Sequence, residues 1–259
     1  ETHLRIGEVY DEMGLTRHAV RRFDEALKEC QDIGNTEEMI DQQLREQTLY
    51  TLWRIFLAKG DLASAAETCR KLQVQFPGSD FIDDSLLDLG RAAAAAGQKD
   101  RAIALYRQVV ELPNGSPLAP EAQFEIAELH AAEIESLNQD GEVAINTSAR
   151  QQAIQAYRTV FTTFPESAQA TDALRRTGDL YFKERNFTHA IDFFEKILRD
   201  YPDAPFLADV LFNLARSYVL KGDAQKSLQM INRLERNHPG YSRMETAIKL
   251  RAFIQKKML

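Results

Sequence analysis

The sequence predicts an all-α solenoid in which paired helices stack in line. Three observations indicate this fold. Only 12 glycines and 8 prolines occur among 259 residues, fewer than strand-and-turn folds normally use. Apolar residues recur at spacings of three and four, which is the period of an α-helix. Dipeptides that end in proline recur at a fixed interval, so one structural unit is repeated along the chain.

The repeated unit is marked by a proline that follows an aromatic residue or a histidine. Phe164-Pro165, Tyr201-Pro202 and His238-Pro239 are spaced by 37 residues each, and Phe76-Pro77 begins an earlier copy. Proline cannot continue a helix, so each of these dipeptides is expected to end one helix and open the connection to the next. The interval therefore predicts the length of the repeating unit.

Each unit is expected to contain a helix, a tight turn and a second helix. Thirteen residues after each proline stands a small residue, at Gly90, Gly178, Ala215 and Ala252. Seven residues further on, a glycine or polar turn ends the first helix, as at Gly97 and Gly222. A second amphipathic run then carries alanine or serine followed by a bulky residue four positions later, as in Ala190 and Phe194. Small residues at the crossing allow the two helices to approach closely.

These residues resemble the tetratricopeptide repeat. The fullest matches are Ile6-Gly7, Tyr10, Gly14, Ala19, Phe23 and Ala26, and then Gly178, Tyr181, Ala190, Phe194 and Pro202. The resemblance implies a right-handed superhelical solenoid of about six helix pairs plus a terminal helix, with a concave groove lined by first helices. The 37-residue spacing is similar to that of repeats in bacterial envelope proteins. This implies a periplasmic location, with a cytoplasmic one as the alternative.

A single solenoid is therefore expected over residues 1–259. The approximate repeats are 1–47, 48–80, 81–117, 118–168, 169–205 and 206–242, with a terminal helix at 243–259. Trp53 occupies a position where the family prefers a small residue, so we expect the second pair to be splayed or slipped in register.

Two insertions interrupt the pattern. Residues Cys30 to Gln47 are expected to lengthen both neighbouring helices, with Gly34-Asn35-Thr36 as a break. About fourteen extra residues between Ile126 and Ala153, including Asn138 to Gly141, are expected to bulge from one edge.

The sequence offers no constellation typical of an enzyme. The five histidines are scattered, and the two cysteines have no histidine at metal-ligand spacing, so neither a metal nor a cofactor is expected. The net charge of -7 argues against nucleic acid as a partner. The sequence contains no run of roughly 18 apolar residues, so no membrane span is expected.

A solenoid without catalytic groups is expected to bind a protein or peptide in its groove. Because first helices line that groove, two positions of each first helix supply the candidates. They are Tyr50, Arg54, Leu87, Arg91, Phe124, Glu128, Arg175, Asp179, Phe212 and Arg216. Arg54 and Arg91 occupy equivalent positions in consecutive pairs, so together they could hold one carboxylate of an acidic partner. The alternative is that each arginine pairs with a neighbouring acid such as Asp84 or Asp88.

The function predicted from these features is that of a noncatalytic scaffold in a bacterial envelope or export assembly. Apolar contacts to Tyr50, Phe124 and Phe212 would supply affinity, and the arginines would fix the register of the partner. The alternative is a spacer or oligomerisation segment of a longer secreted or membrane-anchored chain, with further repeats of the same chain beside it.

Overall fold

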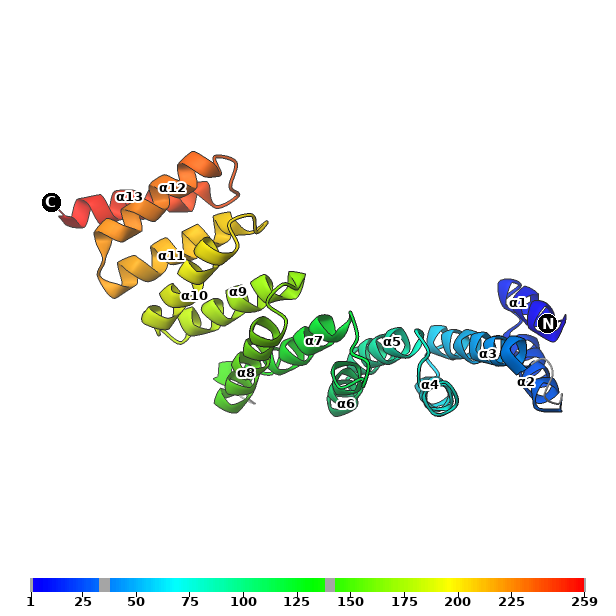
Figure 1. Ribbon diagram of the computed structural model, residues 1–259. Coiled ribbons are helices and arrows are strands. Elements are labelled where there is room, and N and C mark those ends of the chain that lie inside the picture. Colours follow the sequence, from blue (N-terminus) through cyan, green and yellow to red (C-terminus); the bar gives the residue numbers. More distant parts are fainter. Residues whose placement is uncertain (1, 33–37, 138–142, 259) are drawn as a thin grey trace. The chain divides into compact units, whose positions relative to one another are not determined.

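The computed structural model describes residues 2–32, 38–137 and 143–258, and these form thirteen α-helices and one short hairpin (Figure 1). The helices are α1 (Thr2–Glu12), α2 (Thr16–Asp32), α3 (Glu38–Ala58), α4 (Leu62–Gln75), α5 (Ile82–Ala95), α6 (Lys99–Val110), α7 (Ala119–Ala131), α8 (Thr147–Thr163), α9 (Ala168–Lys183), α10 (Phe187–Asp200), α11 (Leu207–Lys221), α12 (Ala224–Asn237) and α13 (Met244–Met258). The strands β1 (Glu135–Leu137) and β2 (Val143–Ile145) pair antiparallel. The all-α prediction is confirmed, and the hairpin lies within the second insertion.

The chain divides into two compact units, Glu1–Ala122 and Gln123–Leu259. In the first unit consecutive helices from α1 to α6 pack against one another, and in the second unit the same holds from α8 to α13. First helices of neighbouring pairs also touch, α3 with α5 and α9 with α11. The repeat boundary expected between residues 47 and 48 falls inside α3, and a continuous solenoid over 1–259 stays a prediction.

The crossing of the two helices in a pair is held by a small residue against a large one. A methyl group added to Gly90 would lie 2.5 Å from the ring of Tyr106, and one added to Gly178 would lie 2.7 Å from the ring of Phe194. Glycine is required here because no β-carbon fits between the helix and the ring. Both aromatic rings are almost fully buried, so these contacts form the centre of each pair.

The second pair exchanges the sizes at this crossing. Trp53 stands where the other pairs carry glycine or alanine, and Cys69, sixteen residues later, stands where they carry an aromatic or a branched residue. Trp53 is 2% exposed and Cys69 is 1% exposed. The large and the small residue therefore occupy each other's positions in the repeat, and both are buried. The splay expected from Trp53 alone stays a prediction.

The helices begin and end at the types of residue that the sequence pattern predicts. Gly222 closes α11 in the left-handed conformation at φ 98°, and Arg185 adopts φ 61° at the equivalent position after α9, where no glycine is present. Asn146 and Asp223 cap α8 and α12 by accepting a hydrogen bond from a backbone amide three residues on. Helices α4, α8, α10 and α12 each end two residues before a proline, as predicted.

The first insertion lengthens its neighbours as predicted, because α2 has 17 residues and α3 has 21, against 14 in α4. The break expected at Gly34-Asn35-Thr36 and the segment from Asn138 to Gly141 lie outside the described residues. Within the described part of the chain, no helix combines the length and apolar character that a bilayer crossing requires.

Candidate functional site

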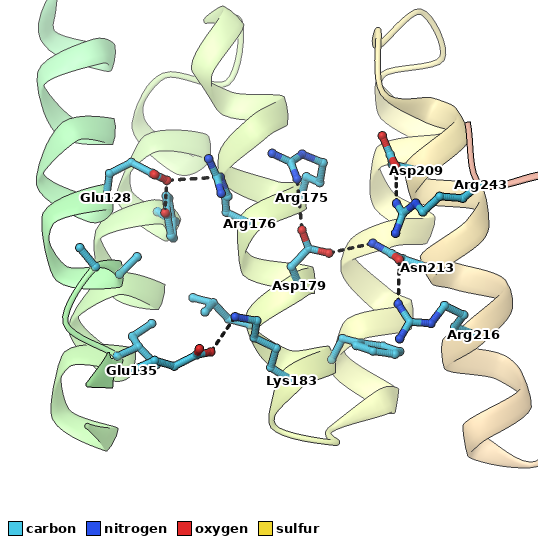
Figure 2. Close-up of a pocket in the computed structure, with 16 residues that line it drawn as sticks. Glu128, Glu135, Arg175, Arg176, Asp179, Lys183, Asp209, Asn213, Arg216 and Arg243 are labelled. Carbon is cyan, nitrogen blue, oxygen red and sulfur yellow. Dashed lines mark hydrogen bonds and ion pairs between the residues drawn. The ribbon is translucent and has the colours of Figure 1, made fainter. Parts of the chain in front are cut away.

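A cleft of about 790 Å³ opens along the first helices of the second unit (Figure 2). Helices α9 and α11 supply most of its wall, and α7, β1, α8 and the segment before α13 complete it. Its charged lining residues are Glu128, Glu135, Arg175, Arg176, Asp179, Lys183, Asp209, Arg216 and Arg243. Five basic groups therefore face four acidic ones, whereas the whole chain is acidic.

Helical spacing places these side chains on one face. Arg175, Asp179 and Lys183 are four residues apart on α9, so they follow one another along the same side of the helix. Asp209, Asn213 and Arg216 repeat this arrangement at spacings of four and three on α11. Because α9 and α11 contact each other, the two polar rows meet in the cleft.

The middle of the cleft is a chain of hydrogen bonds between the two helices. The guanidinium of Arg175 lies 3.2 Å from Asp179 Oδ2, and Asn213 donates to Asp179 Oδ1 at 3.0 Å. Arg216 donates to Asn213 Oδ1 at 3.4 Å. Figure 2 shows this row running from α9 to α11. Burial raises the pKa of the Asp179 carboxyl although Arg175 and Arg176 pull it down.

The edge of the cleft near α7 and the hairpin is also paired. Arg176 Nε lies 3.3 Å from Glu128 Oε1, and the same oxygen accepts a hydrogen bond from the Tyr157 hydroxyl. Burial, together with that hydrogen bond, raises the pKa of Tyr157, so the phenol remains a donor. Lys183 Nζ lies 2.7 Å from Glu135 Oε1 of β1, which ties the hairpin to α9.

The opposite edge is formed by Asp209 and Arg243. Asp209 accepts hydrogen bonds from the Tyr241 hydroxyl at 2.7 Å and from Arg243. Burial alone would raise the pKa of Asp209, but these two hydrogen bonds hold it below the usual value for an aspartate. Arg243 is therefore already paired with an acid of the cleft, Asp209.

Arg216 differs from the other four basic groups. Its guanidinium lies over the ring of Phe182 at 4.4 Å from the centroid and donates to the neutral amide of Asn213. Among the residues that the structure describes, Arg216 forms no ion pair with a carboxylate, because none lies within 4.0 Å of its nitrogens. Burial, and then repulsion from Arg243, lower its pKa. The cleft therefore holds one partly desolvated cation that, among the described residues, forms no ion pair with a carboxylate and is attracted only at longer range by Asp179.

Several of the residues predicted from the sequence come together in this cleft. Arg175 and Arg216 line it, as do the acids Glu128 and Asp179 at equivalent repeat positions. Phe124 lies beside it, with its ring 5.5 Å from that of Tyr157. Their roles in binding a partner stay predictions.

Two predicted groove residues are buried in the fold, and their role in binding a partner stays a prediction. Phe212 is 3% exposed and packs in the apolar cluster around Leu211, with Arg243 lying 4.8 Å above its ring. Leu87 is 2% exposed. Position in the repeat placed both on the right helix, but neighbouring side chains cover them.

The first unit has only a smaller pocket at the predicted positions. Tyr50 and Arg54 line a pocket of about 370 Å³, where Tyr50 stacks on Phe81 at 4.3 Å between ring centroids. Arg91 lies 2.9 Å from Asp88 and also pairs with Glu121, so the alternative of pairing with a neighbouring acid is confirmed for Arg91.

Sequence reasoning missed seven polar groups of the cleft: Glu135, Tyr157, Arg176, Lys183, Asp209, Asn213 and Arg243. Glu135 lies in the second insertion, and the other six occupy positions of the repeat that were not considered to face the groove. One signal was available, because acids recur six residues before the crossing residue, at Asp84, Asp172 and Asp209. In the part of the chain that the structure describes, no group of histidine, cysteine and acidic side chains could hold a metal ion.

Paired helices with a glycine-aromatic crossing and a polar cleft along the first helices define a tetratricopeptide-repeat protein. Residues 172–204 and 209–241 match the tetratricopeptide repeat model. Residues 41–181, more than half of the chain, match the family described as outer membrane lipoprotein, YfiO, and the chain belongs to this family. The α11 side of the cleft lies beyond the residues matched to that family.

Comparison with individual proteins agrees with this membership. The chain is similar to the outer membrane protein assembly factor BamD of Caulobacter vibrioides, with 24% identity over 232 residues that cover 82% of this chain and 72% of the relative. A tetratricopeptide repeat protein from Parabacteroides merdae superposes with a TM-score of 0.51 at 21% identity, covering 82% of this chain and 73% of that one. BtubC from P. vanneervenii gives 0.51 at 16% identity, covering 86% and 91%. These structures show the fold alone.

Proposed function

We propose that this protein is a noncatalytic scaffold at the periplasmic side of a bacterial outer membrane, where its cleft binds an acidic segment of a partner protein. The family supports the location, since its members are described as outer membrane lipoproteins. The relative from Caulobacter vibrioides supports the class of task, since its name is that of an outer membrane protein assembly factor.

The observation that carries the proposal is the state of Arg216. Four basic groups of the cleft are already paired with acids of the same chain, whereas Arg216 lies over Phe182 and, among the described residues, forms its hydrogen bond with the neutral amide of Asn213. A carboxylate from a partner would accept two parallel hydrogen bonds from the guanidinium of Arg216, with little rearrangement of the cleft side chains. The paired charges on either side would fix the orientation of the partner.

A charge reversal at Arg216 tests this function. Proteins are captured by the purified chain from a detergent-solubilised envelope fraction and quantified by mass spectrometry. Arg216→Glu should reduce capture of a specific partner by about tenfold or more, because the carboxylate then meets a like charge. Arg216→Lys should retain part of the binding, because the charge remains while the planar fork is lost.

Arg233→Glu is the matched control, since Arg233 is exposed on α12 outside the cleft. It should leave capture unchanged, and all variants should keep the helical circular-dichroism signal. Equal capture by Arg216→Glu and the unmodified chain would rule out the cleft as the binding site. Self-association in sedimentation without any captured partner would favour the spacer or oligomerisation interpretation instead.

A further inference from the structure

A groove of about 390 Å³ lies in the first unit, between the loop that joins α4 to α5 and the loop that joins α6 to α7. Figure 1 shows these two connections. The apolar part of its lining consists of Ile82, Leu112, Leu118 and three prolines, Pro77, Pro113 and Pro117. Ser116 Oγ donates to Asp83 Oδ2 at 2.7 Å, which ties the two loops together. Because proline fixes the backbone angle φ, the walls of this loop groove are held in shape before a partner binds.

The charges that line the loop groove have one sign. They are Asp80, Asp83 and Asp84, and no basic residue is among its lining residues. Within the part of the chain that the structure describes, no basic nitrogen lies within 4.0 Å of these three carboxylates. Burial, and then repulsion from Asp83 and Asp88, raise the pKa of Asp84, and Arg91 opposes this rise. The fold therefore brings acids together here without a cation that pairs with them.

The same position of the repeat is paired in the second unit. Asp84 stands six residues before the crossing residue Gly90, as Asp209 stands six residues before Ala215. Asp209 accepts a hydrogen bond from Arg243, which stands directly before α13. In the second unit, therefore, an arginine from the start of a later helix neutralises this acid.

In the first unit, a leucine occupies the position of that arginine. Leu118 stands directly before α7, as Arg243 stands directly before α13. The backbone is alike at both places, because the first amide of α7 bonds to the carbonyl of Ser116 and the first amide of α13 bonds to the carbonyl of Tyr241. Leu118 and Asp84 both line the loop groove. Asp84 therefore lacks the cation that its counterpart in the second unit has.

We propose that the loop groove binds a basic segment of a partner protein, which places one arginine side chain beside Asp84 as Arg243 lies beside Asp209 in the second unit. Leu118 and the prolines contact the aliphatic part of that side chain, and the guanidinium pairs with the carboxylate. The other two acids of the groove attract the basic residues beside that arginine.

The charge of the first unit as a whole favours the same partner. The net charge of -7 falls entirely in Glu1–Ala122, because acidic and basic residues balance in Gln123–Leu259. An excess of acids raises the local concentration of a basic segment and speeds its association. The partner of the loop groove is therefore opposite in charge to the one proposed for the cleft of the second unit.

A short arginine peptide provides the probe. It is fluorescently labelled and carries several arginines separated by leucine and glycine, and a matched peptide carries citrulline in place of each arginine. Fluorescence anisotropy with the full chain should show saturable binding of the arginine peptide that weakens with added salt. The citrulline peptide has nearly the same shape without the charge, and it should bind at least about tenfold more weakly. No saturable binding of the arginine peptide up to about 1 mM would overturn the proposal.

Two variants of the chain locate the site. Asp84→Asn removes the acid and should weaken binding of the arginine peptide about fivefold or more. Leu118→Arg supplies the missing arginine from within the chain, as Arg243 does, and should weaken binding about tenfold or more. The controls are Asp100→Asn and Val74→Arg, which make the same changes of charge at exposed positions of α6 and α4 outside the groove. Both controls should leave binding unchanged, and all four variants should keep the helical circular-dichroism signal.

Three further outcomes are decisive. Equal weakening by Leu118→Arg and Val74→Arg would show attraction to net charge alone and would contradict the proposed position. Concentration-dependent self-association that Leu118→Arg abolishes would identify a second copy of this chain as the occupant, which would overturn the assignment to a partner protein. Loss of peptide binding in the cleft variant Arg216→Glu would place the peptide in the cleft instead. Asp84→Asn should leave capture of the acidic partner unchanged, so the two proposals fail separately.

Discussion

Equivalent positions on the first helices of the two units carry arginines whose side chains have different partners. In the first unit, the arginine that follows the crossing residue Gly90 is tied to Asp88 and Glu121. In the second unit, the arginine that follows Ala215 rests on Phe182 and pairs with no described acid. The repeat fixes where a side chain lies, and the neighbours decide whether its charge is available.

The largest effect is expected at the exchanged crossing of the first unit. Trp53→Ala should lower the free energy of unfolding by about 3–5 kcal/mol because it leaves a cavity. Cys69→Phe alone should cost about 1–3 kcal/mol by overpacking. The double variant restores the small-large order of the other pairs and should recover most of this loss. Urea unfolding should be followed by circular dichroism, because Trp53 is the only tryptophan. Simply additive losses would show that the two side chains do not share the crossing.

Crossings with glycine should lose stability when volume is added at the small residue, not when it is removed. Gly90→Ala in the first unit and Gly178→Ala in the second place a methyl group 2.5 Å and 2.7 Å from an aromatic ring. Each should cost about 1–3 kcal/mol of unfolding free energy despite the better helix propensity of alanine. Gly240→Ala is the control, since no atom lies within 4 Å of the added carbon and its change should stay within about 0.5 kcal/mol. A stabilised Gly178→Ala would contradict the close approach of the two helices.

These crossings could be predicted from the sequence because they depend on local signals. Glycine, aromatic and proline positions recur at fixed intervals, and each reports a conformational or packing need of its own helix pair. Arg185 shows the limit of such signals, because it adopts a positive φ without being glycine, and only its place in the repeat indicates that.

The cleft could be predicted only in part. Arg175 and Arg216 were found from the repeat, but burial of Phe212 depends on Arg243 and on the cluster around Leu211. The hairpin that brings Glu135 to the cleft lies in an insertion with no repeat pattern. Such contacts depend on residues that are distant in the sequence, and their pairing is set by three-dimensional packing.

The two aspartates of the cleft should give opposite pH dependence. Burial raises the pKa of Asp179 above the ordinary 3.8, so the folded state holds this proton more tightly and stability falls as the pH rises through that raised value. Although burial opposes it, hydrogen bonds from Tyr241 and Arg243 lower the pKa of Asp209. The stability that Asp209 contributes is therefore complete above 3.8 and is lost as the pH falls below it.

Urea unfolding of two asparagine variants from about pH 3 to pH 7 measures this difference. The cost of Asp209→Asn should grow as the pH rises and reach roughly 0.5–1 kcal/mol at neutral pH, since solvent screens this half-exposed group. The cost of Asp179→Asn should shrink over the same range, because the substitution removes a charge that burial disfavours. Parallel pH profiles would show that the two carboxylates share one environment.

The smallest expected changes in unfolding free energy concern the two arginines, Arg91 and Arg216. Arg91→Met removes a surface ion pair and should cost about 0–1 kcal/mol of unfolding free energy, less at high salt, because Arg91 is 43% exposed. Arg216→Met removes a partly buried cation with no acidic partner in the described residues and keeps an apolar side chain over Phe182. It should leave stability unchanged or raise it slightly, with little dependence on salt. If Arg216→Met were the more destabilising variant and salt reduced its effect, Arg216 would have to be satisfied within the fold, and the cleft would have no free cation for a partner.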